Sequence, residues 1–209
     1  MNHDPNNNYF TQFSLPLHLR IDLAALEKRF YALSRKLHPD RFAARSAEEQ
    51  AAALGESSRL NDAYRTLKEP IARTEYLLKL EGVELEEQSK SATEAARATG
   101  TAKKQIVPAD LLEEAFDLNM HLEEMRAAKK MGEDDPQLRT DLLAAKNSFD
   151  AKMAATQAEL EALWVRWDAA LDAEDATAKA AARDAMVALL NRRSYLRNLV
   201  RDVNDALEA

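Results

Sequence analysis

Few side chains in this 209-residue sequence could carry out chemistry. There is no cysteine, so the chain has no thiolate nucleophile, no disulfide and no cysteine-ligated zinc. Its histidines, His3, His18, His38 and His121, lack the spacing to acidic neighbours that metal sites use. Four glycines cannot build a phosphate-binding loop. We therefore expect no catalytic site, no metal and no cofactor, and a protein that is not an enzyme.

One short motif stands apart, the sequence His38-Pro39-Asp40 directly after an amphipathic segment. At 100° per residue, the apolar stripe of that segment leaves a basic outer face and a basic flank. The cations that surround the motif are Lys28, Arg29, Arg35, Lys36 and Arg41. A plainer interpretation is that these cations solvate a helix and that Pro-Asp forms an ordinary turn.

Helices must position this motif. Asp22 is a good N-cap for the basic helix, which must stop near His38 because Pro39 disfavours helical geometry in the residue before it. Ser46 and Glu49 form a capping box for a helix through about residue 67. A further helix is expected over 71–80. Tyr9, Phe10 and Phe13 are enough for a short turn or a docked arm before the basic helix.

The second half predicts three longer helices. A weakly apolar stretch comes first and is expected to be a linker with a fraying helix near 92–98. Helices are then predicted over about 110–131 and 136–172. A bend is predicted at 172–175, before the last helix. The apolar stripes of the two long helices are formed by Leu142, Phe149, Met153, Leu160, Leu163, Trp167 and Leu171, and by Met186, Leu189, Leu196, Val200, Val203 and Leu207. Short connections favour an antiparallel three-helix bundle.

Composition agrees with an all-α fold, because the chain has 39 Ala and 29 Leu but only 9 Val plus Ile. The net charge of −7 divides into +2 over residues 1–80 and −9 over 81–209, which suggests two modules. The acidic balance argues against a nucleic-acid partner. No apolar run is long enough to cross a membrane, and no signal peptide is visible. We expect a cytoplasmic protein.

The context of the motif resembles a J-domain, the DnaJ-type module: a basic helix, His38-Pro39-Asp40, a partner helix and the ending Tyr64-Arg65-Thr66-Leu67. The resemblance extends to the HscB family of iron–sulfur cluster co-chaperones. It is carried by Tyr9-Phe10-x-x-Phe13-x-Leu15-Pro16, by the stretch from Lys36 to Phe42, and above all by the run from Asn61 to Leu78. It implies a J-domain over 1–81, a linker over 82–108 and a scaffold-binding three-helix bundle over 109–209.

The resemblance also implies two protein partners. The first is an HscA-type, DnaK-class heat-shock ATPase, whose ATP hydrolysis this chain would stimulate. His38, Pro39 and Asp40 would engage that chaperone, and the surrounding cations would meet an acidic surface on it. The second partner is the iron–sulfur scaffold protein IscU, which the C-terminal bundle would deliver.

The residues by themselves do not decide which surface of the bundle would bind the scaffold. Leu112, Phe116 and Met120 form a second apolar stripe on the helix over 110–131, and Tyr195 falls outside the core stripe of the last helix. A wide apolar face can simply be core in a bundle. The resemblance instead assigns Leu112, Phe116 and Tyr195 to scaffold binding. Met120 and Asn119 depart from the family, which often has acidic residues on this face.

Two other functions compete with the HscB-type hypothesis. The chain could be a general J-domain adaptor that presents a different client to a DnaK-class chaperone. It could also be a helical enzyme or regulator whose J-like segment is coincidental, although it lacks a nucleophile, metal ligands and a phosphate loop.

Overall fold

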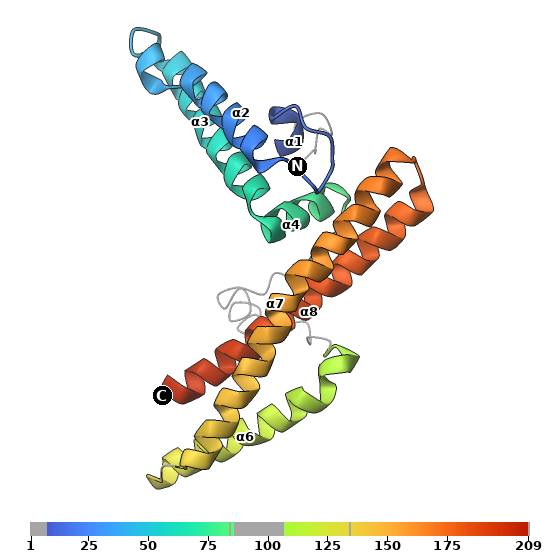
Figure 1. Ribbon diagram of the computed structural model, residues 1–209. Coiled ribbons are helices and arrows are strands. Elements are labelled where there is room, and N and C mark those ends of the chain that lie inside the picture. The colour runs from blue at the N-terminus through green and yellow to red at the C-terminus, as the bar shows by residue number, and fades with distance from the viewer. Residues whose placement is uncertain (1–7, 84, 86–106, 134, 209) are drawn as a thin grey trace. The chain divides into compact units, whose positions relative to one another are not determined.

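The computed structural model describes residues 8–83, 85, 107–133 and 135–208, and the regular structure of these residues is entirely helical (Figure 1). The all-α fold class is confirmed. The N-terminal elements are α1 (Tyr9–Gln12), α2 (Leu23–Lys36), the 3-10 turn η1 (Pro39–Phe42), α3 (Ala47–Lys68) and α4 (Pro70–Leu80). Helices α2 and α3 lie side by side and antiparallel, and α3 also contacts α1 and α4 (Figure 1).

The predicted caps explain where these helices begin. The Asp22 side chain accepts hydrogen bonds from the backbone N–H groups of Ala24 and Ala25, at the start of α2. Ser46 and Glu49 form the expected capping box at the start of α3. Because these side chains satisfy N–H groups that have no partner within the helix, the helix starts are encoded locally.

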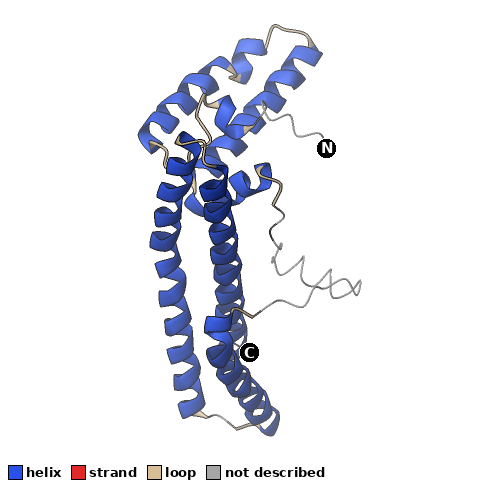
Figure 2. Cartoon of the chain, turned by 90° about the vertical axis from the view of Figure 1, so that its right-hand side faces the viewer, coloured by secondary structure: helices blue, strands red, loops and turns tan. Residues whose placement is uncertain are grey.

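The C-terminal elements are η2 (Ala109–Leu111), α6 (Leu112–Met131), α7 (Pro136–Asp172) and α8 (Ala176–Glu208), seen from another side in Figure 2. Gly132 ends α6 with a φ of 74°, a left-handed conformation that glycine adopts without steric cost. The predicted bend is confirmed between α7 and α8. There the Asp175 carboxylate accepts hydrogen bonds from the N–H groups of Thr177 and Ala178 and so caps α8.

The chain divides into two compact units. The first unit is Met1–Leu85 with Glu161–Met186, and the second unit is Glu86–Leu160 with Val187–Ala209. Both α7 and α8 therefore contribute residues to each unit. The predicted linker falls largely on residues 86–106, and the helix expected near 92–98 falls wholly there, outside the described residues. The limits at 81 and 108 stay a prediction.

In the first unit, one turn of α7 binds the segment that leads into α2. The Asp168 carboxylate accepts hydrogen bonds from the backbone N–H groups of Leu19 (2.7 Å) and Arg20 (3.1 Å). The Trp167 indole N–H donates to the Leu17 carbonyl at 3.0 Å. On the same segment, His18 Nε2 lies 2.8 Å from the Asp172 carboxylate. Residues 17–20 are thereby fixed by three hydrogen bonds to their backbone, by the side chain of His18 and by the burial of Leu19.

A buried arginine joins α4 to the same helix. Arg73 donates from Nη1 to the Leu67 carbonyl at 2.6 Å, and its guanidinium lies 4.6 Å from the ring centroid of Trp164. The Trp164 indole N–H in turn donates to Thr74 Oγ1 at 2.9 Å. Burial lowers the pKa of Arg73, while the negative charge of Asp168 acts in the opposite direction. The sequence stripe on α7 included Trp167 but omitted Trp164.

The second unit has a core shared by three helices, as the bundle prediction requires. Helix α6 and the preceding η2 turn supply the first group of side chains, and α7 and α8 supply the rest. The buried members are Leu111, Ala115, Leu118, Leu122, Met125, Leu138, Leu142, Phe149, Tyr195, Leu196, Leu199 and Val203.

Removing the Asp168 carboxylate should destabilise the protein. In the variant Asp168→Ala, the buried N–H of Leu19 loses its acceptor, and we expect the free energy of unfolding to fall by about 2 kcal/mol. Urea denaturation of the full chain, followed by circular dichroism, measures this change.

The matched control is Asp172→Ala, four residues along the same helix. Its carboxylate is 67% exposed, so losing its contact with His18 should cost less than about 0.5 kcal/mol. Equal effects of the two substitutions would contradict the role assigned to Asp168.

Candidate functional site

The basic face of α2 is exposed because its other side packs on α3. Leu26 is buried, and the ring of Phe30 stacks on that of Tyr64 with centroids 4.3 Å apart. Lys28 and Arg35 lie on the outer side and are exposed. Lys36 is exposed beside Arg35 in the last turn, where positive charge also interacts favourably with the helix dipole.

The motif after α2 forms a short capped turn. His38 is the N-cap of η1, and its Nδ1 accepts a hydrogen bond from the backbone N–H of Asp40 at 3.3 Å. A neutral ring in this arrangement carries its proton on Nε2, which remains a donor. The side chains are open to solvent, with exposed fractions of 57% for His38 and 89% for Asp40. The turn thus presents a donor and a carboxylate that the protein itself does not bury.

Neighbouring residues support this turn from both helices. Arg41 donates from Nη1 to the Arg35 carbonyl at the end of α2 (3.4 Å). On the α3 side, the Gln50 amide donates to the carbonyls of Ala43 (3.4 Å) and Arg45 (3.0 Å). The exposed His38 and Asp40 are therefore held on a loop whose two ends are tied down.

Arg29 has a structural role that the sequence did not predict. Its Nη1 donates to the carbonyls of Phe13 and Ser14, which follow α1. Ser14 adopts a φ of 51°, so this hydrogen bonding supports an uncommon backbone conformation. Arg29 therefore differs from Lys28 and Arg35, and its assignment to partner binding stays a prediction.

The exposed apolar surface predicted on α6 is present, but Tyr195 is not part of it. The exposed fractions are 60% for Leu112, 64% for Phe116 and 49% for Met120, whereas Tyr195 is only 9% exposed and belongs to the core of the second unit. The expectation that Tyr195 lies outside the core is wrong, because the core uses a wider arc of α8 than one stripe. Burial raises the pKa of Tyr195, and the negative charge of Asp202 adds to this effect.

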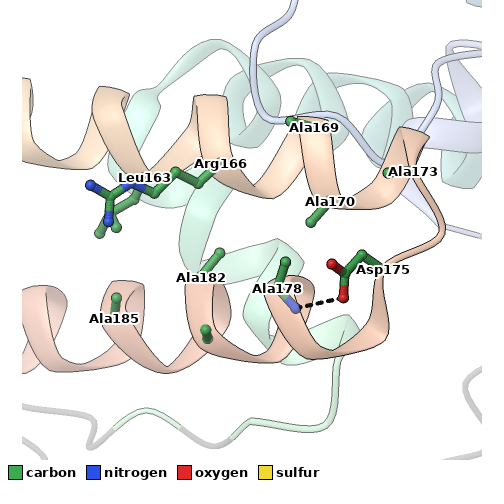
Figure 3. A pocket seen from close by; sticks show the side chains of 10 residues that line it. Leu163, Arg166, Ala169, Ala170, Ala173, Asp175, Ala178, Ala182 and Ala185 are labelled. Atoms are coloured by element: carbon green, nitrogen blue, oxygen red, sulfur yellow. Dashed lines mark hydrogen bonds between the residues drawn. The ribbon is translucent and has the colours of Figure 1, made fainter.

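A cavity between α7 and α8 offers no chemistry of its own. It has a volume of about 450 Å³ and is lined mainly by alanines, with Leu163, Arg166 and Asp175 (Figure 3). Figure 3 shows the Asp175 carboxylate accepting from the Ala178 N–H, so this side chain serves as a helix cap. Within the described residues, no group of three or more histidines, cysteines or acidic residues could hold a metal ion. None of the helices described there is long and apolar enough to span a bilayer.

Comparison with solved structures gives the family. The chaperone HscB from Vibrio cholerae is 26% identical, with a TM-score of 0.54, and the match covers 97% of this chain and 98% of that one. This near-full-length similarity supports an HscB-family assignment. The human co-chaperone protein HscB has the same fold, with a TM-score of 0.57 at 23% identity, over 98% of this chain and 84% of the human one. No protein-family model matches the chain.

The HscB-family assignment confirms the resemblance predicted from the sequence. That resemblance was carried by His38-Pro39-Asp40 and by the run from Asn61 to Leu78. In the structure this run forms the last two turns of α3 and most of α4, and some of its side chains make structural contacts. Tyr76, for example, stacks on Tyr9 with centroids 4.3 Å apart and accepts a hydrogen bond from the Tyr9 N–H. The most family-specific stretch therefore includes a residue that joins α4 to α1.

The burial of Tyr195 makes a stability prediction. Tyr195→Ala should lower the free energy of unfolding by about 3 kcal/mol because it leaves a cavity in the core. Leu112→Ala, on the exposed side of α6, should change it by less than about 1 kcal/mol. Chemical denaturation of both variants tests the contrast. An unchanged stability of Tyr195→Ala would contradict the core assignment.

Proposed function

We propose that this protein is a co-chaperone that stimulates the ATPase of an HscA-type heat-shock chaperone and delivers to it an IscU-type scaffold for iron–sulfur cluster assembly. The observation that carries the proposal is the exposed, doubly supported turn of His38 and Asp40 at the end of a basic helix. Family membership supports it, because the V. cholerae relative is named a chaperone and the human relative a co-chaperone.

In this proposal the chain regulates a reaction that its partner performs. The turn binds the ATPase between its nucleotide domain and the adjacent linker, as in other J-domains. Lys28, Arg35 and Lys36 face an acidic surface of the ATPase, with Arg41 beside them. Such exposed charges act mainly on the association rate and lose strength as salt rises. No residue of this chain has to change its covalent state.

The second half of the proposal concerns the scaffold. Leu112 and Phe116 are large apolar side chains that lie mostly in solvent, and surfaces of this kind usually bind another protein. Leu112 and Phe116 are the direct contacts in this proposal. Tyr195, at 9% exposed, supports them from the core that it shares with Leu111 and Ala115.

Replacing the turn tests the ATPase half. With His38, Pro39 and Asp40 all changed to alanine, we expect stimulation of steady-state ATP hydrolysis by the cognate chaperone to fall at least tenfold, because the exposed donor and carboxylate are lost. His121→Gln is the control, since it changes another histidine on a helix far along the sequence and should leave stimulation unchanged. Full stimulation by the triple variant would refute this half of the proposal.

The scaffold half is tested by binding. Leu112→Ala together with Phe116→Ala should weaken binding of the purified scaffold at least tenfold, because truncating apolar anchors in an interface commonly costs 1 kcal/mol or more each. Calorimetric titration measures the change. If the wild-type chain stimulates the ATPase but does not bind the scaffold, the general J-domain adaptor with a different client becomes the better description.

A further inference from the structure

The start of α6 differs from the starts of α2, α3 and α8. Those three helices are capped by the side chains of Asp22, Ser46 and Asp175, which accept hydrogen bonds from backbone N–H groups. Pro108 and Leu111 occupy the N-cap positions of η2 and α6, and within the described residues neither makes a side-chain capping hydrogen bond. The first turn of α6 therefore lacks the local support that fixes the other three helix starts.

Ion pairs with the two long helices hold this start instead. On α8, Arg192 donates from Nε to an Asp110 carboxylate oxygen at 2.8 Å, and its Nη1 lies 3.8 Å from a carboxylate oxygen of Glu159 on α7. Also on α7, Lys152 pairs with Glu114 in the first turn of α6. Because Asp110 lies in the η2 turn, Arg192 links the start of α6 to both long helices of the second unit. We call the pairs of Arg192 with Asp110 and Glu159 the ionic latch.

Arg192 is partly buried where it makes these contacts. Its side chain is 24% exposed, whereas those of Asp110 and Glu159 are 54% and 53% exposed. A partly buried guanidinium that reaches two carboxylates through different nitrogens is a stronger link than a fully exposed ion pair. Three residues further along α8, Tyr195 lies in the same buried cluster as Leu111. The cation is therefore held beside the core, directly at the point where α6 begins.

We propose that Arg192 is a positioning residue for the scaffold surface, because the ionic latch holds the first turns of α6 in place. Leu112 and Phe116 lie in those turns, and Asp110 lies two residues before Leu112. This inference rests on the proposed function and deepens it, since it states what fixes the two contact side chains and what regulates them. Screening weakens ion pairs, so the latch loosens as salt rises. The contact surface itself is hydrocarbon, and salt acts on it through the latch.

Hydrogen exchange of the full-length chain tests the latch. In α6 the N–H groups of Phe116 and Asp117 bond to carbonyls four residues earlier, so their exchange reports whether the first turn opens. Arg192→Gln should raise their exchange rates about three- to tenfold and leave the middle of α7 unchanged. Arg201→Gln is the matched control on α8, because Arg201 pairs with its neighbour Asp202 on the same helix. It should leave exchange in α6 unchanged.

Calorimetric titration with the purified cognate scaffold tests the positioning role. At low salt, Arg192→Gln should raise the dissociation constant about two- to fivefold, and at about 1 M salt, where the wild-type pair is already screened, the difference should vanish. Arg192→Lys keeps the charge but not the two-nitrogen geometry, so it should restore part of the affinity. Asp110→Asn should also weaken binding. Because both substitutions break the same pair, the double variant should bind no more weakly than Arg192→Gln alone.

The outcomes separate the inference from the proposed function. If Leu112→Ala with Phe116→Ala weakens binding while Arg192→Gln changes neither exchange nor binding, the latch is wrong and the proposed function stands. If Arg192→Gln speeds exchange but leaves the dissociation constant unchanged, Arg192 only stabilises the helix and the positioning role is refuted. An equal loss of affinity at low and high salt would show that the effect is not ionic and overturn the inference. If the scaffold does not bind the wild-type chain, the proposed function fails and the positioning role fails with it.

Discussion

Asp168 places a carboxylate where only 9% of the residue reaches solvent, and it is stable there because two consecutive backbone N–H groups donate to it. This contact holds the segment that leads into α2. Residues 17–20 are fixed against α7, Asp22 can then cap α2 two residues later, and the start of α2 determines which way its cations face. Arg29 secures the preceding carbonyls from the other end. The segments that precede the basic helix are thus held by backbone hydrogen bonds far from the His38 turn.

The two sides of helix α6 have different roles. Its core side joins α7 and α8 through a continuous apolar cluster, while nearly the opposite side keeps large apolar groups in solvent. A helix that served only the bundle would gain solubility from polar residues at those positions. The two functions proposed for this protein therefore use opposite kinds of surface: exposed charge on α2, where screening by salt matters, and exposed hydrocarbon on α6, where it does not.

The sequence predicted those features whose causes lie within a few residues. Asp22, the Ser46–Glu49 capping box and Gly132 mark helix ends through local hydrogen bonds or backbone conformation, and the structure has helix ends at each. The exposed stripe of Leu112 and Phe116 followed from helical periodicity. Tyr195, Trp164 and Asp168 were missed or misplaced because their surroundings include residues from other helices and segments distant in the sequence. The periodicity within one helix carries no information about such partners. The HscB-type motif was visible because its residues are adjacent.

The two tryptophans of this chain both lie in the first unit, each with its indole N–H donated to residues from the N-terminal part of the chain: Trp164 to Thr74 and Trp167 to Leu17. Trp164 also lies against the Arg73 guanidinium and Trp167 against the Lys179 ammonium. The protein consequently carries an intrinsic optical reporter. The emission of its two indole rings should change when residues 161–186 separate from the J-domain elements. It should stay the same when a change is confined to the second unit.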